Sequence, residues 1–196
     1  MRACAALLLL CLVADAGWCQ RPMSNLVPNH GQLQDSVYSN SYFGMRYSLP
    51  AAQSWFVNDD ALQQEATRPG KPAGYFLLTV LDRHTGGALR ERVAIAADET
   101  ARYSPPLITP RGYVEKVTAA LSKQGNRVLG KVVEVRINGR DFYRGNFREE
   151  DAEIYKALVA TEARGFILSW TFAASSEAGL EQIVGTLAQL SIAPPQ

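Results

Sequence analysis

Apolar and polar positions are most regularly patterned over residues 131–190, where they predict four strands followed by a helix. Asn138-Gly139 separates two β-prone runs, KVVEVRI and RDFYRGNF, and this dipeptide favours a two-residue type I′ turn. That turn pairs Ile137 with Arg140, whereas a three-residue loop would place Arg136 opposite Arg140 and bring like charges together. The pattern therefore predicts a tight hairpin.

Two further strands and a helix complete this half of the chain. The third strand is expected over 153–161, and a turn at 163–165 leads into the fourth, over 166–174. The fourth carries no charged residue on either face, which is typical of a central strand covered on both sides. A helix capped by Ser175 or Ser176 follows, and its apolar residues recur at helical spacing: Leu180, Ile183, Val184, Leu187 and Leu190.

The first half of the chain predicts shorter elements. Alternation over 43–49, ended by Pro50, predicts a half-buried strand. The other expected elements are an extended segment at 55–57, a short helix over 59–66, and strands over 74–81 and 92–97. A further helix is expected to begin at Thr109-Pro110 and to end at Gly125.

The N-terminus has the pattern of a secretory signal peptide, assigned to residues 1–19. Met1-Arg2 precedes the apolar run ACAALLLLCLVA and an Ala-x-Ala site, and cleavage after Ala16 or after Cys19 fits the small residues there. The alternative is a buried first helix. Lipid attachment at Cys19 is disfavoured because Trp18 stands where a small residue is needed. We expect a secreted or periplasmic protein.

Composition excludes several classes of function. All three cysteines, Cys4, Cys11 and Cys19, lie within residues 1–19, so the mature domain contains no internal disulfide and no zinc-type cysteine spacing. The net charge of +1 gives no support for a nucleic-acid footprint or a polybasic membrane surface. No charge-free run reaches the length of a bilayer span.

Residues 20–37 are rich in Asn, Gln, Pro, Ser and Gly and are expected to form a flexible linker. A single domain is then expected over 38–192. Its opening, YSNSYFGMRYSLP over 38–50 with Trp55, resembles the start of PsbP-like domains, and the later hairpin, strand run and C-terminal helix are similar to the same family.

This resemblance implies an α+β fold in which an antiparallel β-sheet meander is covered by helices on both faces. Such domains dock to larger assemblies or are exported domains without an assigned role. The spacing from Pro50 to Trp55 is longer than the usual one, and no metal-binding or photosystem-docking residue of the family is matched in this chain. Fold alone does not decide function.

Catalytic chemistry has one candidate, His84, which stands beside Asp82 and could serve as a general base for a nucleophile such as Ser104. No G-x-S-x-G, HExxH, P-loop or GxGxxG motif accompanies it. The run DRHTGG after a strand is typical of a solvated turn. His30 stands alone in the linker. We therefore expect a non-enzymatic protein without a cofactor or metal.

The second hairpin strand contains the candidate binding residues. The two-residue turn places Arg140, Arg144 and Arg148 on the apolar face of the first strand. A β-bulge at Gly145, or arginine stems lying over apolar neighbours, would explain this placement. The alternative is an anion site that grips an acidic partner surface.

Tyr143 and Phe147 lie on the opposite face of the same strand, where a helix would cover them or, if uncovered, they would form a partner patch. The pattern as a whole predicts an accessory or interaction domain whose partner is an envelope or extracellular protein. The alternatives are an extracytoplasmic small-molecule or anion-binding domain that uses Arg144 and the aromatics, and a hydrolase that uses His84.

Overall fold

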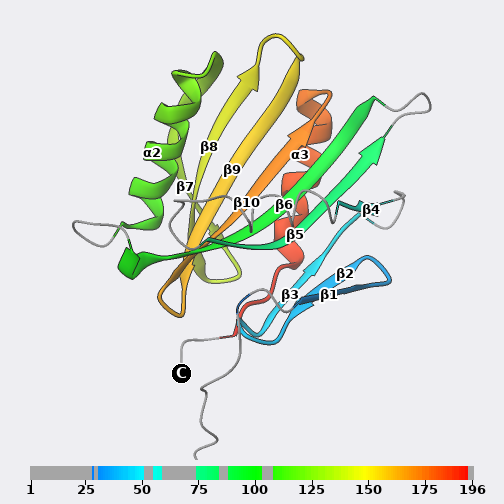
Figure 1. Ribbon diagram of the computed structural model, residues 1–196, viewed down its shortest axis with the longest axis vertical. Coiled ribbons are helices and arrows are strands. Elements are labelled where there is room, and N and C mark those ends of the chain that lie inside the picture. The colour runs from blue at the N-terminus through cyan, green and yellow to red at the C-terminus, as the bar shows by residue number, and fades with distance from the viewer. Residues whose placement is uncertain are drawn as a thin grey trace, which may run out of the picture.

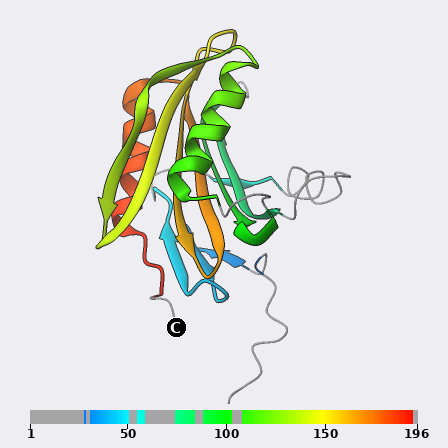
Figure 2. The same ribbon diagram turned by 90° about the vertical axis from the view of Figure 1, so that its left-hand side faces the viewer.

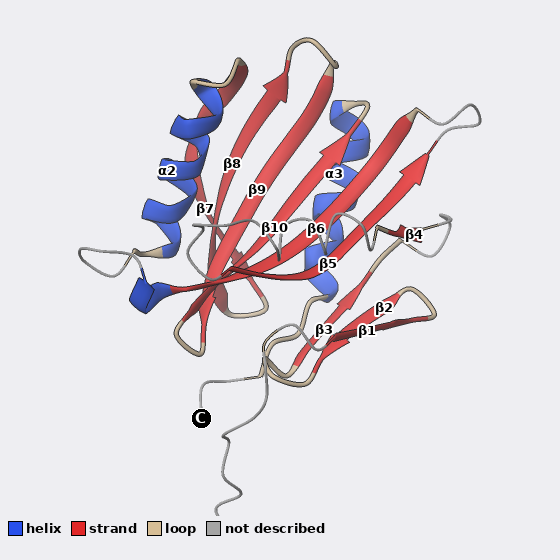
Figure 3. Cartoon of the chain, viewed as in Figure 1, coloured by secondary structure: helices blue, strands red, loops and turns tan. Residues whose placement is uncertain are grey.

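The computed structural model describes residues 28, 31–50, 55–58, 74–83, 88–102 and 108–193 (Figures 1 and 3). A small sheet contains β1 (Gly31–Gln34), β2 (Val37–Asn40) and β3 (Met45–Ser48). A large sheet contains β4 (Phe56–Val57), β5 (Gly74–Arg83), β6 (Leu89–Glu99), β7 (Asn126–Ile137), β8 (Arg140–Glu149), β9 (Ile154–Ala163) and β10 (Phe166–Ala174). The helices are η1 (Thr100–Arg102), α2 (Pro110–Ser122), α3 (Glu177–Gly185) and η2 (Thr186–Gln189).

The large sheet is antiparallel, in the order β4-β5-β6-β10-β9-β8-β7. The predicted α+β class with an antiparallel sheet is confirmed, but the strands do not form one continuous meander. After β6 the chain passes through α2 to the outer edge of the sheet, runs back inward from β7 to β10, and closes by pairing β10 with β6. Turn residues determine which consecutive strands pair with each other, but they do not determine the long-range pairing of β10 with β6.

The hairpin register is the predicted one. Ile137 pairs with Arg140 and Arg136 with Asp141, and positive φ angles of 49° at Asn138 and 79° at Gly139 form the two-residue turn. The Asn138 side chain also donates a 2.7 Å hydrogen bond to the Leu190 carbonyl. The turn therefore ties the hairpin to the chain that leaves η2.

Strand β10 occupies the centre of the large sheet, between β6 and β9. All its residues are buried except the half-buried Thr171. This confirms the prediction from its uncharged sequence. The adjacent turn has positive φ at Arg164 and Gly165, which allows β9 and β10 to pair closely.

The two α-helices, α2 and α3, pack on opposite faces of the large sheet (Figure 2). Thr109 caps α2 by accepting from the Gly112 N–H at 3.1 Å, as predicted, and α2 lies over β7, β8 and β9. Ser176 caps α3, which contacts β6, β9 and β10. The small sheet shares the core on the α3 side, with Phe43, Met45 and Tyr47 fully buried. The α3 face of the large sheet is therefore covered by both α3 and the small sheet, not by helices alone.

The ordered structure begins earlier than composition predicts. Within the predicted linker 20–37, residues 31–34 form β1 and Val37 begins β2. The polar segment is held by backbone pairing with β2 and by close packing of Gly31 on the Tyr38 ring. Because this stability comes from pairing rather than from an apolar pattern, composition alone does not indicate it.

Several predicted features lie outside the described residues. These are the signal peptide at 1–19, the helix over 59–66, and the side chains of His30, His84 and Ser104. Within the part that is described, no helix is long and apolar enough to cross a membrane.

Candidate functional site

The arginines of β8 face α3, and the middle one has a carboxylate partner. Arg144 forms a bidentate ion pair with Glu181 of α3, with one N–O distance of 3.0 Å, and its Nε donates to Asn146 at 2.8 Å. The side chain is 13% exposed. The hydrogen bonds from Arg144 lower the pKa of Glu181. The positive charge on this face is thus balanced by the helix that covers it.

The flanking arginines also have acceptors within the chain. Arg140 donates to the carbonyls of Glu162 at 2.7 Å and Ala193 at 3.3 Å. Arg148 pairs with Glu153 at 3.3 Å and lies over the Tyr155 ring, 5.1 Å from its centroid. The structure therefore uses these cations to hold β8 to neighbouring segments.

The two aromatic candidates lie under α2. Phe147 is 2% exposed and packs with Val114, Leu158 and Ile167 in the cluster on the α2 face. Tyr143 is half-buried against the same cluster. Of the two alternatives left by the sequence, the structure shows the covered one, so Phe147 is a core residue here.

The bulge predicted at Gly145 lies on the partner strand. The register shifts between Leu129 and Val133, so that three residues of β7 stand opposite Gly145, and Gly130 has a φ of 81°. Gly145 instead serves the packing of α2, because a Cβ at this position would lie 2.7 Å from Thr118 Cγ2. The bulge of β7 therefore lies beside the point at which α2 approaches β8 most closely.

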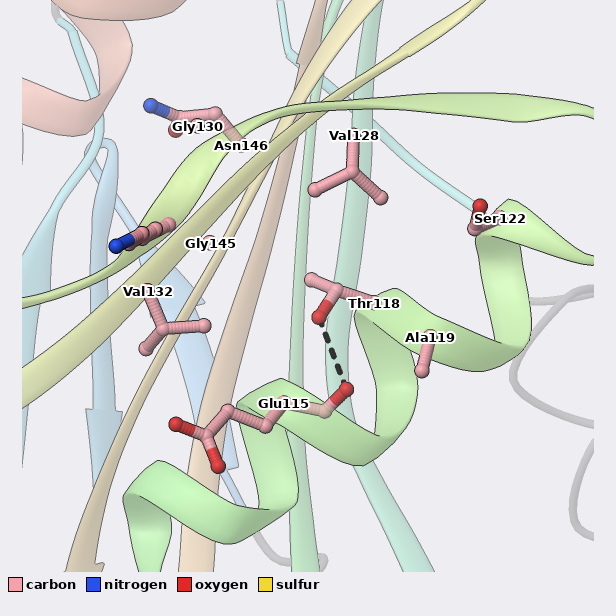
Figure 4. A pocket seen from close by; sticks show the side chains of 10 residues that line it. Glu115, Thr118, Ala119, Ser122, Val128, Gly130, Val132, Gly145 and Asn146 are labelled. Atoms are coloured by element: carbon pink, nitrogen blue, oxygen red, sulfur yellow. Dashed lines mark hydrogen bonds between the residues drawn. The ribbon is translucent and has the colours of Figure 1, made fainter.

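These two features open a groove of about 290 Å³ between α2 and β7 (Figure 4). Val128 and Val132 extend from β7 toward the helix, and Thr118 faces them from α2. The Thr118 hydroxyl donates to the Val114 and Glu115 carbonyls, so its methyl group is left facing the groove side. The remaining lining residues are Glu115, Ala119, Ser122, Gly130, Lys131, Gly145 and Asn146.

The groove borders a free sheet edge. Strand β7 is the terminal strand of the large sheet, and among the described residues nothing pairs with its outer side. Val128 is 39% exposed on the α2 face, and Val133 is 50% exposed on the face that carries Arg144. An extended segment added at this edge would contact both valines.

The sequence prediction missed this edge for an identifiable reason. It began the strand at Lys131, whereas β7 begins at Asn126, so Val128 was not assigned to a strand. Gly130 interrupts the alternation of β7, which concealed its first part. The run VLGKVV does contain the pattern on each side of the glycine.

The described residues hold no group of three or more His, Cys, Asp or Glu side chains that could bind a metal ion. The candidate base His84 lies outside them. The groove contains Glu115 as its one acidic side chain and no histidine or cysteine. Its lining is suited to contact with apolar groups and peptide backbone.

Comparison with solved structures shows a PsbP-like fold. The chain is similar to cyanobacterial PsbP (CyanoP) from Synechocystis sp. PCC 6803, with a TM-score of 0.54 and 14% identity over 82% of this chain and 94% of that chain. A protein from Bacteroides thetaiotaomicron VPI-5482 matches with a TM-score of 0.32 and 7% identity, over 86% of this chain and 50% of that chain. No protein-family model and no curated protein matches the sequence.

Proposed function

We propose that this protein is an exported, non-enzymatic interaction domain whose β7 edge binds an extended segment of an envelope or extracellular protein. The observation that carries the proposal is the free edge strand with exposed valines beside the α2–β7 groove. Addition of a strand to a free edge satisfies backbone hydrogen bonds, and pockets beside the edge provide specificity.

The charge of β7 favours an acidic partner over a second copy of the chain. The strand carries Arg127, Lys131 and Arg136 but one acidic residue, Glu134. Arg127 pairs with Glu150 and Arg136 with Asp141, but both ion pairs are exposed to solvent and therefore weak, so these cations remain accessible to a partner. Two such edges would bring cations together, and the bulge at Gly130 disrupts a continuous ladder. An acidic extended segment would meet complementary charge along the same strand.

Export rests on the leader pattern of residues 1–19. When the gene is expressed with its leader in a secreting host, we expect the mature chain to be found outside the cytoplasm and to begin at Gly17 or Gln20. N-terminal sequencing of the purified chain measures this. A protein that retains Met1 and stays in the cytoplasm would contradict the export part of the proposal.

The partner site is tested by placing aspartate on the free edge. We expect Val128→Asp and Val133→Asp to reduce capture of the bound partner from the native envelope fraction about tenfold or more each, because a charge replaces an apolar contact and repels an acidic segment. Quantitative mass spectrometry of the captured proteins measures the loss.

The matched control is Val57→Asp on β4, at the other edge of the sheet. Val57 is 45% exposed, so this variant makes the same substitution at similar exposure. A partner that binds wild type and Val57→Asp equally, but not the two β7 variants, supports the site. Equal capture by all four proteins would show that the partner does not bind at β7.

The small-molecule alternative that uses Arg144 requires a cation without an internal counter-charge. Arg144 has Glu181 as its counter-charge, and Arg140 and Arg148 also have acceptors within the chain. The hydrolase alternative depends on His84 and Ser104, which lie outside the described residues, and its carboxylate candidate Asp82 is ion-paired with Arg90. The interaction domain is the function that the geometry supports best.

A further inference from the structure

A second basic cluster lies on the α2 face of the large sheet, opposite to the face that carries Arg144 of β8. Arg92 of β6 and Lys156 of β9 both pair in register with Ala173 of β10, so the three residues form one row across the sheet. Residues in register share a face, and Lys156 stands opposite Phe147 of the α2-side cluster. With strands about 4.8 Å apart, the two cationic residues are about 10 Å apart at Cα.

The surface between these cations is lined by small residues. Ala173 separates them, and the adjacent row on the same face places Ala94 beside Thr171. Ala94 and Thr171 are half-buried, so their side chains can be reached from solvent. No large side chain of the central strand stands between Arg92 and Lys156, and the Thr171 hydroxyl adds a hydrogen-bond donor.

Arg92 differs from the β8 arginines in that it has no ion-pair or hydrogen-bond acceptor among the described residues. Within that part of the chain its buried Nε has no acceptor, which is also true of the Arg148 Nε, but Arg148 is paired with Glu153 whereas no carboxylate pairs with the Arg92 guanidinium. Burial lowers the pKa of Arg92, with Glu149 the opposing electrostatic influence. Glu149, however, is ion-paired with Lys156. A partly buried guanidinium without an acceptor is unfavourable, and a bound anion would stabilise it by accepting its hydrogen bonds and balancing its charge.

The charges in the cluster indicate the class of ligand. Arg92 and Lys156 are positive and Glu149 is negative, which leaves one positive charge. Arg90, two residues earlier on β6, is balanced by its ion pair with the buried Asp82. A single planar carboxylate matches both this charge and the forked geometry of a guanidinium. A phosphate dianion would leave the cluster with a net negative charge.

We infer that Arg92, with Lys156 and Thr171, forms a binding site for the carboxylate group of a small molecule on the Ala94–Ala173 surface. This site is separate from the proposed β7 edge, because β8 lies between them and the buried Phe147 separates Lys156 from Val128. It also differs from the Arg144 site predicted from the sequence, whose cation is internally paired.

The test observes the arginine Nε–H groups of the purified protein by ¹H–¹⁵N NMR during titration with sodium acetate. We expect a saturable shift of the Arg92 signal in the millimolar range. The Arg144 signal is the internal control, because its Nε already donates to Asn146 and should not move. Sodium chloride at the same ionic strength should leave both signals in place.

Two variants and one further ligand sharpen the result. Arg92→Gln should weaken acetate binding about tenfold or more, detected through backbone amides around Ala173. Arg136→Gln, at an exposed arginine of β7, should bind as wild type does. The proposed site would be overturned if chloride shifted the Arg92 signal as much as acetate does, or if acetate shifted the signals of all arginines equally. A saturable response to phosphate but none to acetate would overturn the carboxylate assignment.

These outcomes are separable from those of the proposed function. Val128→Asp should lose partner capture and retain acetate binding, whereas Arg92→Gln should retain capture. Loss of both properties in each variant, with unchanged unfolding transitions, would show that the two surfaces are not independent and would contradict the site as placed here.

Discussion

Trp170→Ala is expected to lower the free energy of unfolding by about 3–5 kcal/mol, the range for removing a large aromatic side chain from a core. Trp170 is completely buried at the centre of β10, where it pairs in register with Ile95 of β6 and Val159 of β9. Its ring meets Phe142 of β8 edge to face, with centroids 5.9 Å apart. Urea unfolding followed by circular dichroism measures the change.

The control is Trp170→Phe, which retains an aromatic ring beside Phe142. The indole Nε1 of Trp170 is buried without an acceptor among the described residues, and an unpaired buried donor is itself unfavourable by about 1–3 kcal/mol. Removing this donor offsets part of the lost packing, so we expect a loss below about 2 kcal/mol. A Trp170→Ala variant as stable as wild type would contradict the central position of β10.

The residues that made the fold predictable act locally. Asn138-Gly139 sets its turn through the φ angles of the two residues themselves, and the uncharged run 166–174 shows burial on both faces within one strand. The order of the sheet depends instead on the pairing of β10 with β6, between segments separated by α2 and three strands. No single turn encodes that pairing.

The candidate site shows the same division. Alternation placed Arg144 correctly on the apolar face of β8, but its partner Glu181 is 37 residues away in sequence. The sequence did not identify Arg92 as a candidate binding residue, because its lack of a counter-charge depends on which strands lie beside β6. Sequence thus indicated where charges stand on a strand, while the structure decides which of them are balanced.

Packing of α2 against β8 gives the second large prediction, Gly145→Ala. The added methyl group would lie 2.7 Å from Thr118 Cγ2 and 3.0 Å from Val114 Cγ1, so the helix must shift away from the sheet. Thr118 and Val114 are buried and their β-branched side chains adjust little. We expect the free energy of unfolding to fall by about 1–3 kcal/mol, measured by urea unfolding.

A second substitution tests whether this contact is the cause. Thr118→Ser removes Cγ2 and retains the hydroxyl that bonds to the Val114 and Glu115 carbonyls. In the Thr118→Ser background, Gly145→Ala should be less destabilising by about 1 kcal/mol or more, a coupling that a double-mutant cycle isolates. Gly185→Ala is the matched control, because a Cβ there meets nothing within 4 Å. If Gly145→Ala were as harmless as Gly185→Ala, α2 would not lie against β8 at this point, and the groove beside β7 would lose its inner wall.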